Sequence, residues 1–213
     1  MIRHIALHTP HGSLHGQLDR PEHPRGLILI ARPHRVPADD PIVAGLAAEG
    51  YAILAMDLLT THELRFADAT QNVPRLVQRL LDVLDLIRYD GDTQDLPLGI
   101  YASGDTTPAA IRCAAQRDFQ VKALVCHGGL IDHAGLQSLK LLVAPLMMLV
   151  APDDKLAPAA YQRAKTYLGG VHQQYQLEPG EHPSTSVTGW FARYLEQSAI
   201  PARSWTSAPD RLC

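Results

Sequence analysis

The chain has 213 residues, of which 46% are hydrophobic and 19% are charged, and it contains 15 glycines and 16 prolines. This composition excludes a disordered or fibrous protein and indicates a globular one with a sizeable core. The formal net charge is -3, from 19 Lys and Arg against 22 Asp and Glu. No basic surplus is available to neutralise a phosphate backbone, so we expect no nucleic-acid partner.

The three cysteines, Cys113, Cys126 and Cys213, have no Cys-x-x-Cys spacing. They predict neither a disulfide framework nor a zinc site, and the 11 histidines show no His-Glu-x-x-His pattern. We therefore expect no metal and no cofactor. Residues 1–10 do not resemble a signal peptide, and the longest apolar run, residues 141–151, is too short to span a bilayer. A cytoplasmic protein without a membrane contact is expected.

The first predicted elements are two extended segments, residues 2–7 and 14–19, on either side of a turn at Pro10, His11 and Gly12. They predict an antiparallel hairpin. From residue 27 onward, short apolar runs alternate with amphipathic stretches, which is typical of parallel strands joined by crossover helices. The predicted strands are residues 27–31, 51–58, 98–102, 123–127, 145–151 and 173–177.

Helices are predicted between these strands. Residues 41–49 follow Asp39 and Asp40, which suit an N-cap, and residues 72–88 repeat apolar side chains at intervals of three and four. The other predicted helices are residues 107–116, 158–168 and 184–197. The pattern predicts an α/β fold with a mostly parallel sheet, an N-terminal antiparallel hairpin and helices on both faces. We expect one domain over residues 1–197 and a surface tail over residues 198–213.

The functional site of a parallel sheet is expected at the carboxyl ends of its strands. Three segments at these ends contain candidate functional residues. Ala102-Ser-Gly-Asp-Thr106 has the outline of a nucleophile elbow between a strand and a helix. Ala151-Pro-Asp-Asp-Lys155 supplies an acid, and Glu178-Pro-Gly-Glu-His182 supplies a histidine. Elbow, acid and histidine follow one another in the chain order of an α/β-hydrolase triad.

The combined pattern resembles the α/β-hydrolase superfamily, and within it the small dienelactone hydrolase-like proteins. The segments that carry the likeness span nearly the whole chain: Gly26-Leu-Ile-Leu-Ile-Ala31, Glu49-Gly-Tyr-Ala-Ile-Leu-Ala-Met-Asp-Leu-Leu-Thr60, Leu96-Pro-Leu-Gly-Ile-Tyr-Ala102, Cys126-His-Gly-Gly129 and Leu149-Val-Ala-Pro-Asp-Asp154. The resemblance implies an α/β-hydrolase fold, with Asp154 and His182 at the acid and histidine positions. Asp153 is the alternative acid.

The resemblance places Gly104 at the nucleophile position of the elbow. Glycine has no side chain to attack with, and it adopts without strain the backbone conformation that the apex of an elbow needs. Ser103 precedes it, and adjacent side chains on a strand point to opposite faces. Cys126 and Cys113 are interpreted as core residues. The sequence thus predicts a degenerate elbow.

The expected oxyanion hole departs from the family pattern as well. Relatives use a glycine-rich turn here, whereas this chain has Arg32 followed by Pro33, which has no N–H to donate. The second donor would be the backbone of Asp105. Arg32, His34 and Arg35, with His182, are instead candidates to line a pocket for a small anion.

Two main functional hypotheses follow from these residues. The first is a dienelactone hydrolase-like protein whose ester or lactone hydrolysis is lost or strongly weakened and which binds a small anionic ligand. The second is an active carboxylesterase or lactonase that uses Ser103, His182 and Asp154. A third reading, a scaffold role as a homodimer, depends on whether the pocket is filled. The sequence does not name a substrate.

Overall fold

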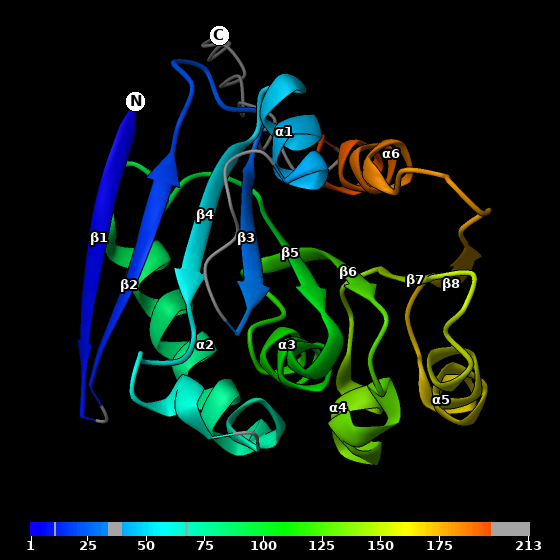
Figure 1. Ribbon diagram of the computed structural model, residues 1–213. Coiled ribbons are helices and arrows are strands. Elements are labelled where there is room, and N and C mark those ends of the chain that lie inside the picture. Colours follow the sequence, from blue (N-terminus) through cyan, green and yellow to red (C-terminus); the bar gives the residue numbers. More distant parts are fainter. Residues whose placement is uncertain (11, 34–39, 67, 197–213) are drawn as a thin grey trace, which may run out of the picture.

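The computed structural model describes residues 1–10, 12–33, 40–66 and 68–196. Its strands form a single mixed sheet in the order β1-β2-β4-β3-β5-β6-β7-β8 (Figure 1). The strand bounds are β1 Ile2–Thr9, β2 Gly12–Asp19, β3 Leu27–Arg32, β4 Ala52–Asp57, β5 Leu98–Ser103, β6 Val121–His127, β7 Leu146–Val150 and β8 His172–Gln176. β2 pairs antiparallel with β1 and β4, and all other pairs are parallel. The predicted hairpin and mostly parallel sheet are confirmed.

The helices agree with prediction except near α4 and α5. Their bounds are α1 Pro41–Ala48, α2 Val73–Tyr89, α3 Thr107–Gln116, α4 Leu136–Leu141, α5 Leu156–Ala164 and α6 Ser184–Leu195, with short 3₁₀ turns η1 Glu63–Arg65, η2 Ala69–Gln71, η3 Gly104–Thr106, η4 Ile131–Ala134 and η5 Lys165–Tyr167. α4 was not predicted, because six residues are too few for a helical period to show. The helix predicted at residues 158–168 begins earlier and tightens into η5.

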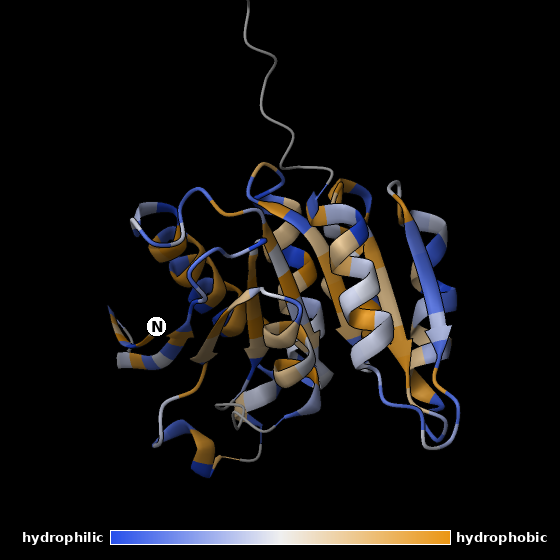
Figure 2. Cartoon of the chain, turned by 90° about the horizontal axis from the view of Figure 1, so that it is seen from above, coloured by the Kyte–Doolittle hydropathy of each residue, from blue (hydrophilic) through white to orange (hydrophobic). Residues whose placement is uncertain are grey.

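The helices cover both faces of the sheet. One core cluster joins one face of the central strands to α2, α3, α4 and α5, and a second joins the opposite face to α1 and α6. Figure 2 shows the central strands in the colours of hydrophobic residues, while β8 at one edge is hydrophilic. Central strands are buried on both faces and therefore read as nearly continuous apolar runs in the sequence.

The parallel strands direct their carboxyl ends to one edge of the sheet. Register places Arg32 beside Asp57 and Ser103 beside His127 at that edge. The loops that follow these strands therefore meet there, as the sequence analysis expected. Among the described residues, no helix combines the length and hydropathy that a membrane crossing would need.

Candidate functional site

The turn between β5 and α3, residues 103–107, which we call the elbow, is sharp and well fixed. Gly104 has φ +56°, in the left-handed region that favours glycine. The hydroxyl of Thr106 lies 2.5 Å from the carbonyl oxygen of Ala31, to which it donates, and it accepts the backbone N–H of Ser103 at 3.2 Å. A Cβ placed on Gly104 would have nothing beyond its chain neighbours within 4 Å. A side chain at this apex would stand in open space.

Ser103 has a different setting from the glycine that follows it. Its backbone is extended, with φ −135° and ψ 144°, and the residue is half-buried at the end of β5. By strand alternation its side chain lies on the face of Tyr101, which packs in the cluster of α1 and α6. Its neighbour across the register is His127. The serine therefore occupies ordinary strand geometry and does not form the apex of the turn.

The loop after β6 packs its backbone directly on the elbow. Gly129 has φ +83°, and a Cβ there would lie 2.2 Å from the carbonyl oxygen of Gly104. The hydroxyl of Thr107 donates to the carbonyl of Gly128 at 3.2 Å. Only glycine allows two backbones to approach so closely. The contact between Gly129 and Gly104 therefore fixes one wall beside the elbow.

Asp154 lies close to this wall and caps a helix. Its Oδ1 accepts the backbone N–H groups of Leu156 and Ala157, both at 2.9 Å, at the start of α5. A Cβ placed on Gly128 would lie 3.3 Å from its Oδ2. The alternative acid, Asp153, is exposed. Asp154 therefore has one oxygen engaged in capping and the other beside the loop that covers the elbow.

His182 lies in the loop between β8 and α6 and is exposed. Within the described part of the chain, no hydrogen bond joins its ring to Asp154 or to another residue. The preceding turn is held by Glu181, which accepts the Tyr175 hydroxyl at 2.7 Å and the backbone N–H of Glu178 at 2.9 Å. Acid and histidine thus follow their strands as expected, but without the hydrogen bond that would orient an imidazole as a base.

A polar network that the sequence analysis missed lies at the ends of β3, β5 and β6. Arg32 pairs with Asp40 at 2.8 Å, and its guanidinium carbon lies 5.4 Å from the centre of the Tyr101 ring. The Tyr101 hydroxyl lies 2.8 Å from Nδ1 of His127. In the sequence, Arg32 was already a candidate for anion binding, and the place of His127 at a strand end, directly after Cys126, was a further signal.

The protonation states in this network follow from burial. Burial raises the pKa of Tyr101, so its hydroxyl keeps its proton. Burial, aided by the positive charge of Arg32, lowers the pKa of His127, so the imidazole is neutral near pH 7. Which group donates in the hydrogen bond between the hydroxyl and Nδ1 depends on the tautomer of the imidazole. The network therefore holds a neutral imidazole.

The remaining residues that the sequence singled out have no shared site in the portion that the structure describes. Asp105 accepts a hydrogen bond of 2.5 Å from the hydroxyl of Thr70, so its carboxylate is tied to η2. Pro33 follows β3 as expected, whereas His34 and Arg35 lie outside the described residues. Cys113 and Cys126 are buried free thiols. Across the described ranges, no three His, Cys, Asp or Glu side chains gather closely enough to hold a metal ion.

Solved structures with the same fold were found by comparison. A dienelactone hydrolase from Anabaena variabilis superposes with a TM-score of 0.81 at 24% sequence identity, covering 92% of this chain and 98% of that one. A cold-adapted esterase from an Arctic intertidal metagenomic library gives a TM-score of 0.67 at 13% identity, covering 91% and 94%. The chain has the α/β-hydrolase fold.

Comparison with curated sequences gives relatives that are not named as hydrolases. Two proteins of Mycobacterium tuberculosis, from strains CDC 1551 / Oshkosh and H37Rv, are each 33% identical over 208 residues, or 93% of this chain. Each is called "Putative phosphoribosyl transferase". The matched region makes up 44% of those relatives, so the chain spans less than half of their length. No protein-family model matches the chain.

Proposed function

We propose that this chain is a dienelactone hydrolase-like protein in which ester or lactone hydrolysis is lost or strongly weakened, and which binds a small anionic or carbonyl ligand. The observation that carries the proposal is Gly104. It has the positive φ of an elbow apex and faces open space, yet it has no atom that can attack a carbonyl carbon.

The surroundings of the elbow support loss of turnover. A serine or cysteine hydrolase needs a base within hydrogen-bond reach of the nucleophile and an acid that orients the base. Here Asp154 caps α5, and His182 is exposed without a bond to it. Pro33 has no N–H and so removes one of the two expected oxyanion donors, the other being the backbone N–H of Asp105. These groups could hold a ligand, but they provide no route to an acyl-enzyme.

Ligand binding is supported by the polar groups at the sheet edge. Arg32 supplies a positive charge, although Asp40 neutralises part of it. His127 adds a neutral imidazole, which in the tautomer with its proton on Nε2 offers an N–H to a carbonyl or carboxylate oxygen. We expect a ligand of modest size whose negative charge is met by Arg32.

The alternative is an active carboxylesterase that uses Ser103, His182 and Asp154. Ser103 would attack the ester carbonyl while His182 accepts its proton, and water would then release the acyl group. This alternative requires the serine to leave its extended strand geometry and the histidine loop to close on it.

One experiment separates the two. The wild type and the Ser103→Ala and Gly104→Ser variants are assayed with p-nitrophenyl acetate and labelled with a serine-directed fluorophosphonate. Our proposal expects no label at Ser103 and the same trace rate for wild type and Ser103→Ala. Stoichiometric label at Ser103, abolished in Ser103→Ala, would establish the esterase instead. Gain of hydrolysis in Gly104→Ser would show that the rest of the site is still poised.

The name of the curated relatives suggests phosphoribosyl transfer as a second candidate. The 33% identity over 208 residues favours it, but that region is 44% of the relatives, whose named activity belongs to the whole proteins. Incubation of this chain with a phosphoribosyl donor, magnesium and a panel of nucleobases, followed by chromatography of the products, tests it directly. Formation of a nucleotide would replace our proposal.

A further inference from the structure

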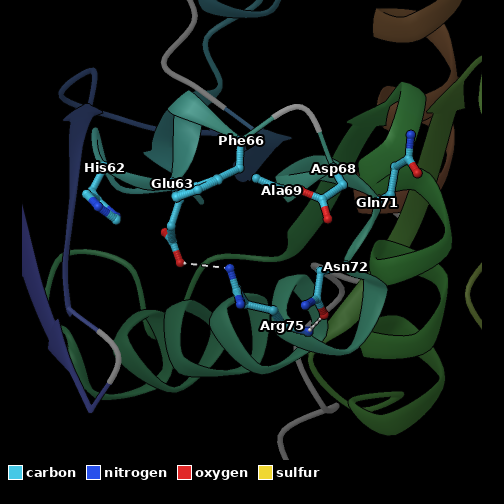
Figure 3. Close-up of a pocket in the computed structure, with 8 residues that line it drawn as sticks. All are labelled: His62, Glu63, Phe66, Asp68, Ala69, Gln71, Asn72 and Arg75. Atoms are coloured by element: carbon cyan, nitrogen blue, oxygen red, sulfur yellow. Dashed lines mark hydrogen bonds and ion pairs between the residues drawn. The ribbon is translucent and has the colours of Figure 1, made fainter.

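A cavity of about 630 Å³ opens between the loop that follows β4 and the N-terminal end of α2 (Figure 3). This volume falls within the range of small-molecule sites, roughly 300–1,000 Å³. The lining residues combine charged, amide and aromatic side chains: His62, Glu63, Phe66, Asp68, Ala69, Gln71, Asn72 and Arg75. We call it the Glu63 cavity.

Glu63 lines the cavity and is held in place by an ion pair with a buried arginine behind it. Arg79 of α2, whose side chain is 1% exposed, donates to both carboxylate oxygens of Glu63 at 2.7 and 2.8 Å and to the carbonyl of Leu58 at 2.5 Å. Thr60 donates its backbone N–H and its hydroxyl to the same carboxylate, at 2.8 and 2.9 Å. Partial burial opposes ionisation of Glu63, but the donors from Arg79 and Thr60 outweigh it and lower its pKa to about 2. The carboxylate of Glu63 is therefore held by several donors, and its charge is balanced by Arg79.

Arg75 and Asn72 form a wall of hydrogen-bond donors. Arg75 donates from Nη1 to Glu63 at 3.1 Å, and no other described residue binds the rest of its guanidinium. The side-chain oxygen of Asn72 accepts the backbone N–H of Arg75 at 3.1 Å, so its amide nitrogen still has its hydrogens to donate. Both groups line the cavity. Together they suit a carboxylate, which a guanidinium and an amide can bind side by side.

The side of the cavity that faces Asn72 and Arg75 carries a negative charge, the carboxylate of Asp68. Figure 3 shows Asp68 reaching from the loop toward Asn72 and Arg75. Its carboxylate forms no ion pair with Arg75 and no hydrogen bond with another residue among those described. The ring of Phe66, which is 54% exposed, adds an apolar wall, and the ring of His62 packs against it edge-on at 5.4 Å. The cavity therefore holds a positive and a negative group apart, beside an exposed aromatic ring.

We propose that the Glu63 cavity binds a small zwitterion of the α-amino-acid type with a planar side chain. The carboxylate of the ligand meets Arg75 and Asn72, its ammonium meets Asp68, and its side chain packs on Phe66. A ligand with one charge would leave unpaired either the carboxylate of Asp68 or those donors of Arg75 that Glu63 does not bind. This site is separate from the apex at Gly104, although the hydrogen bond of Thr70 to Asp105 links the two regions.

Three related probes test the ligand class by isothermal titration calorimetry. L-Phenylalanine has both charges, 3-phenylpropionate has only the carboxylate, and phenethylamine has only the ammonium group. We expect L-phenylalanine to bind more tightly than either analogue, by about fivefold for each charge that an analogue lacks. Absence of heat with L-phenylalanine up to millimolar concentrations, or equal affinity for 3-phenylpropionate, would overturn the proposal.

Two variants assign the charges to their residues. Asp68→Asn should bring the affinity for L-phenylalanine down to that for 3-phenylpropionate, and Arg75→Gln should bring it down to that for phenethylamine. Arg65→Gln removes an exposed cation of η1 that does not line the cavity, so it serves as the matched control and should bind like wild type. Thermal unfolding of each variant separates lost binding from lost folding. Equal losses in all three variants would contradict the assignment.

Discussion

The elbow and the Glu63 cavity lie at the same edge of the sheet, but their geometry is fixed by different means. At the elbow, backbone contacts between Gly104 and Gly129 set the shape, and among the described residues no hydrogen bond joins Asp154 to His182. In the Glu63 cavity, side chains set the shape, since Arg79 and Glu63 hold the loop after β4 onto α2. A backbone scaffold can keep its form after losing reactive groups. An ion-pair scaffold depends on both partners.

The largest expected effect comes from the ion pair. Arg79→Met should lower the free energy of unfolding by about 3–5 kcal/mol, because the carboxylate of Glu63 is left partly buried without its main partner. Urea unfolding followed by circular dichroism measures it. Arg75→Gln, which removes a half-exposed partner of the same carboxylate, is the control and should cost less than about 1 kcal/mol. If Arg79→Met and Arg75→Gln lower the free energy of unfolding by similar amounts, the pair of Arg79 and Glu63 does not fix the cavity.

The backbone scaffold is tested by Gly129→Ala. Its Cβ would lie 2.2 Å from the oxygen of Gly104, so we expect a loss of about 2–4 kcal/mol from overpacking and backbone strain together. Gly180 has the same φ of +83° but open space around its Cβ. Gly180→Ala therefore reports strain alone and should cost about 1 kcal/mol. If the two variants unfold at the same urea concentration, the close contact at the elbow has no energetic weight.

Acid should weaken the Glu63 cavity in a defined range. The pKa of Glu63 is lowered from its usual 4.5 to about 2 in the folded protein, so folding favours its ionised form. That contribution is complete above pH 4.5 and is lost as the pH falls toward 2. The stability of wild type relative to Glu63→Gln should therefore shrink over this range. A difference that stays constant from pH 6 to pH 3 would exclude the ionised pair as its source.

The smallest effect is expected in the network below the elbow. Tyr101→Phe removes the hydroxyl that lies 2.8 Å from Nδ1 of His127, at a cost of about 1 kcal/mol. The proposed ligand binding needs a free N–H on Nε2, so ¹⁵N chemical shifts of the imidazole should show the proton on Nε2 in wild type and a mixture of tautomers in the variant. A proton on Nδ1 in the wild type would reverse the direction of this hydrogen bond.

Protonation of His127 in acid should lower the stability of the folded protein. Its pKa is lowered by burial, so the folded state resists protonation. Stability is unaffected well above the ordinary pKa of 6.5 and falls as the pH drops below it, because the unfolded chain then binds the proton first. Histidine titration by NMR should give a midpoint below 6.5. A midpoint above that value would mean that Asp154 outweighs burial.

Much of the fold could be predicted because its signals are local. The strand-length apolar runs and the period of residues 72–88 reflect burial of one or both faces, and each appears within a few neighbouring residues. α4 escaped because its six residues are shorter than two helical turns. Of the candidate site, the sequence predicted only the order of its parts along the chain: elbow, acid, histidine. Residues after β5, β7 and β8 were expected at one edge, and the parallel sheet brings them there.

The sequence by itself determined the alternation of elements, the glycine at position 104 and the proline after β3, because these are properties of single residues and short patterns. Only the tertiary structure decided which groups meet. The pair of Arg79 with Glu63 is 16 residues apart in the chain, and the bond of Tyr101 to His127 is 26 apart. Such contacts depend on how strands and helices pack, and a one-residue shift in register would separate them without changing any local pattern.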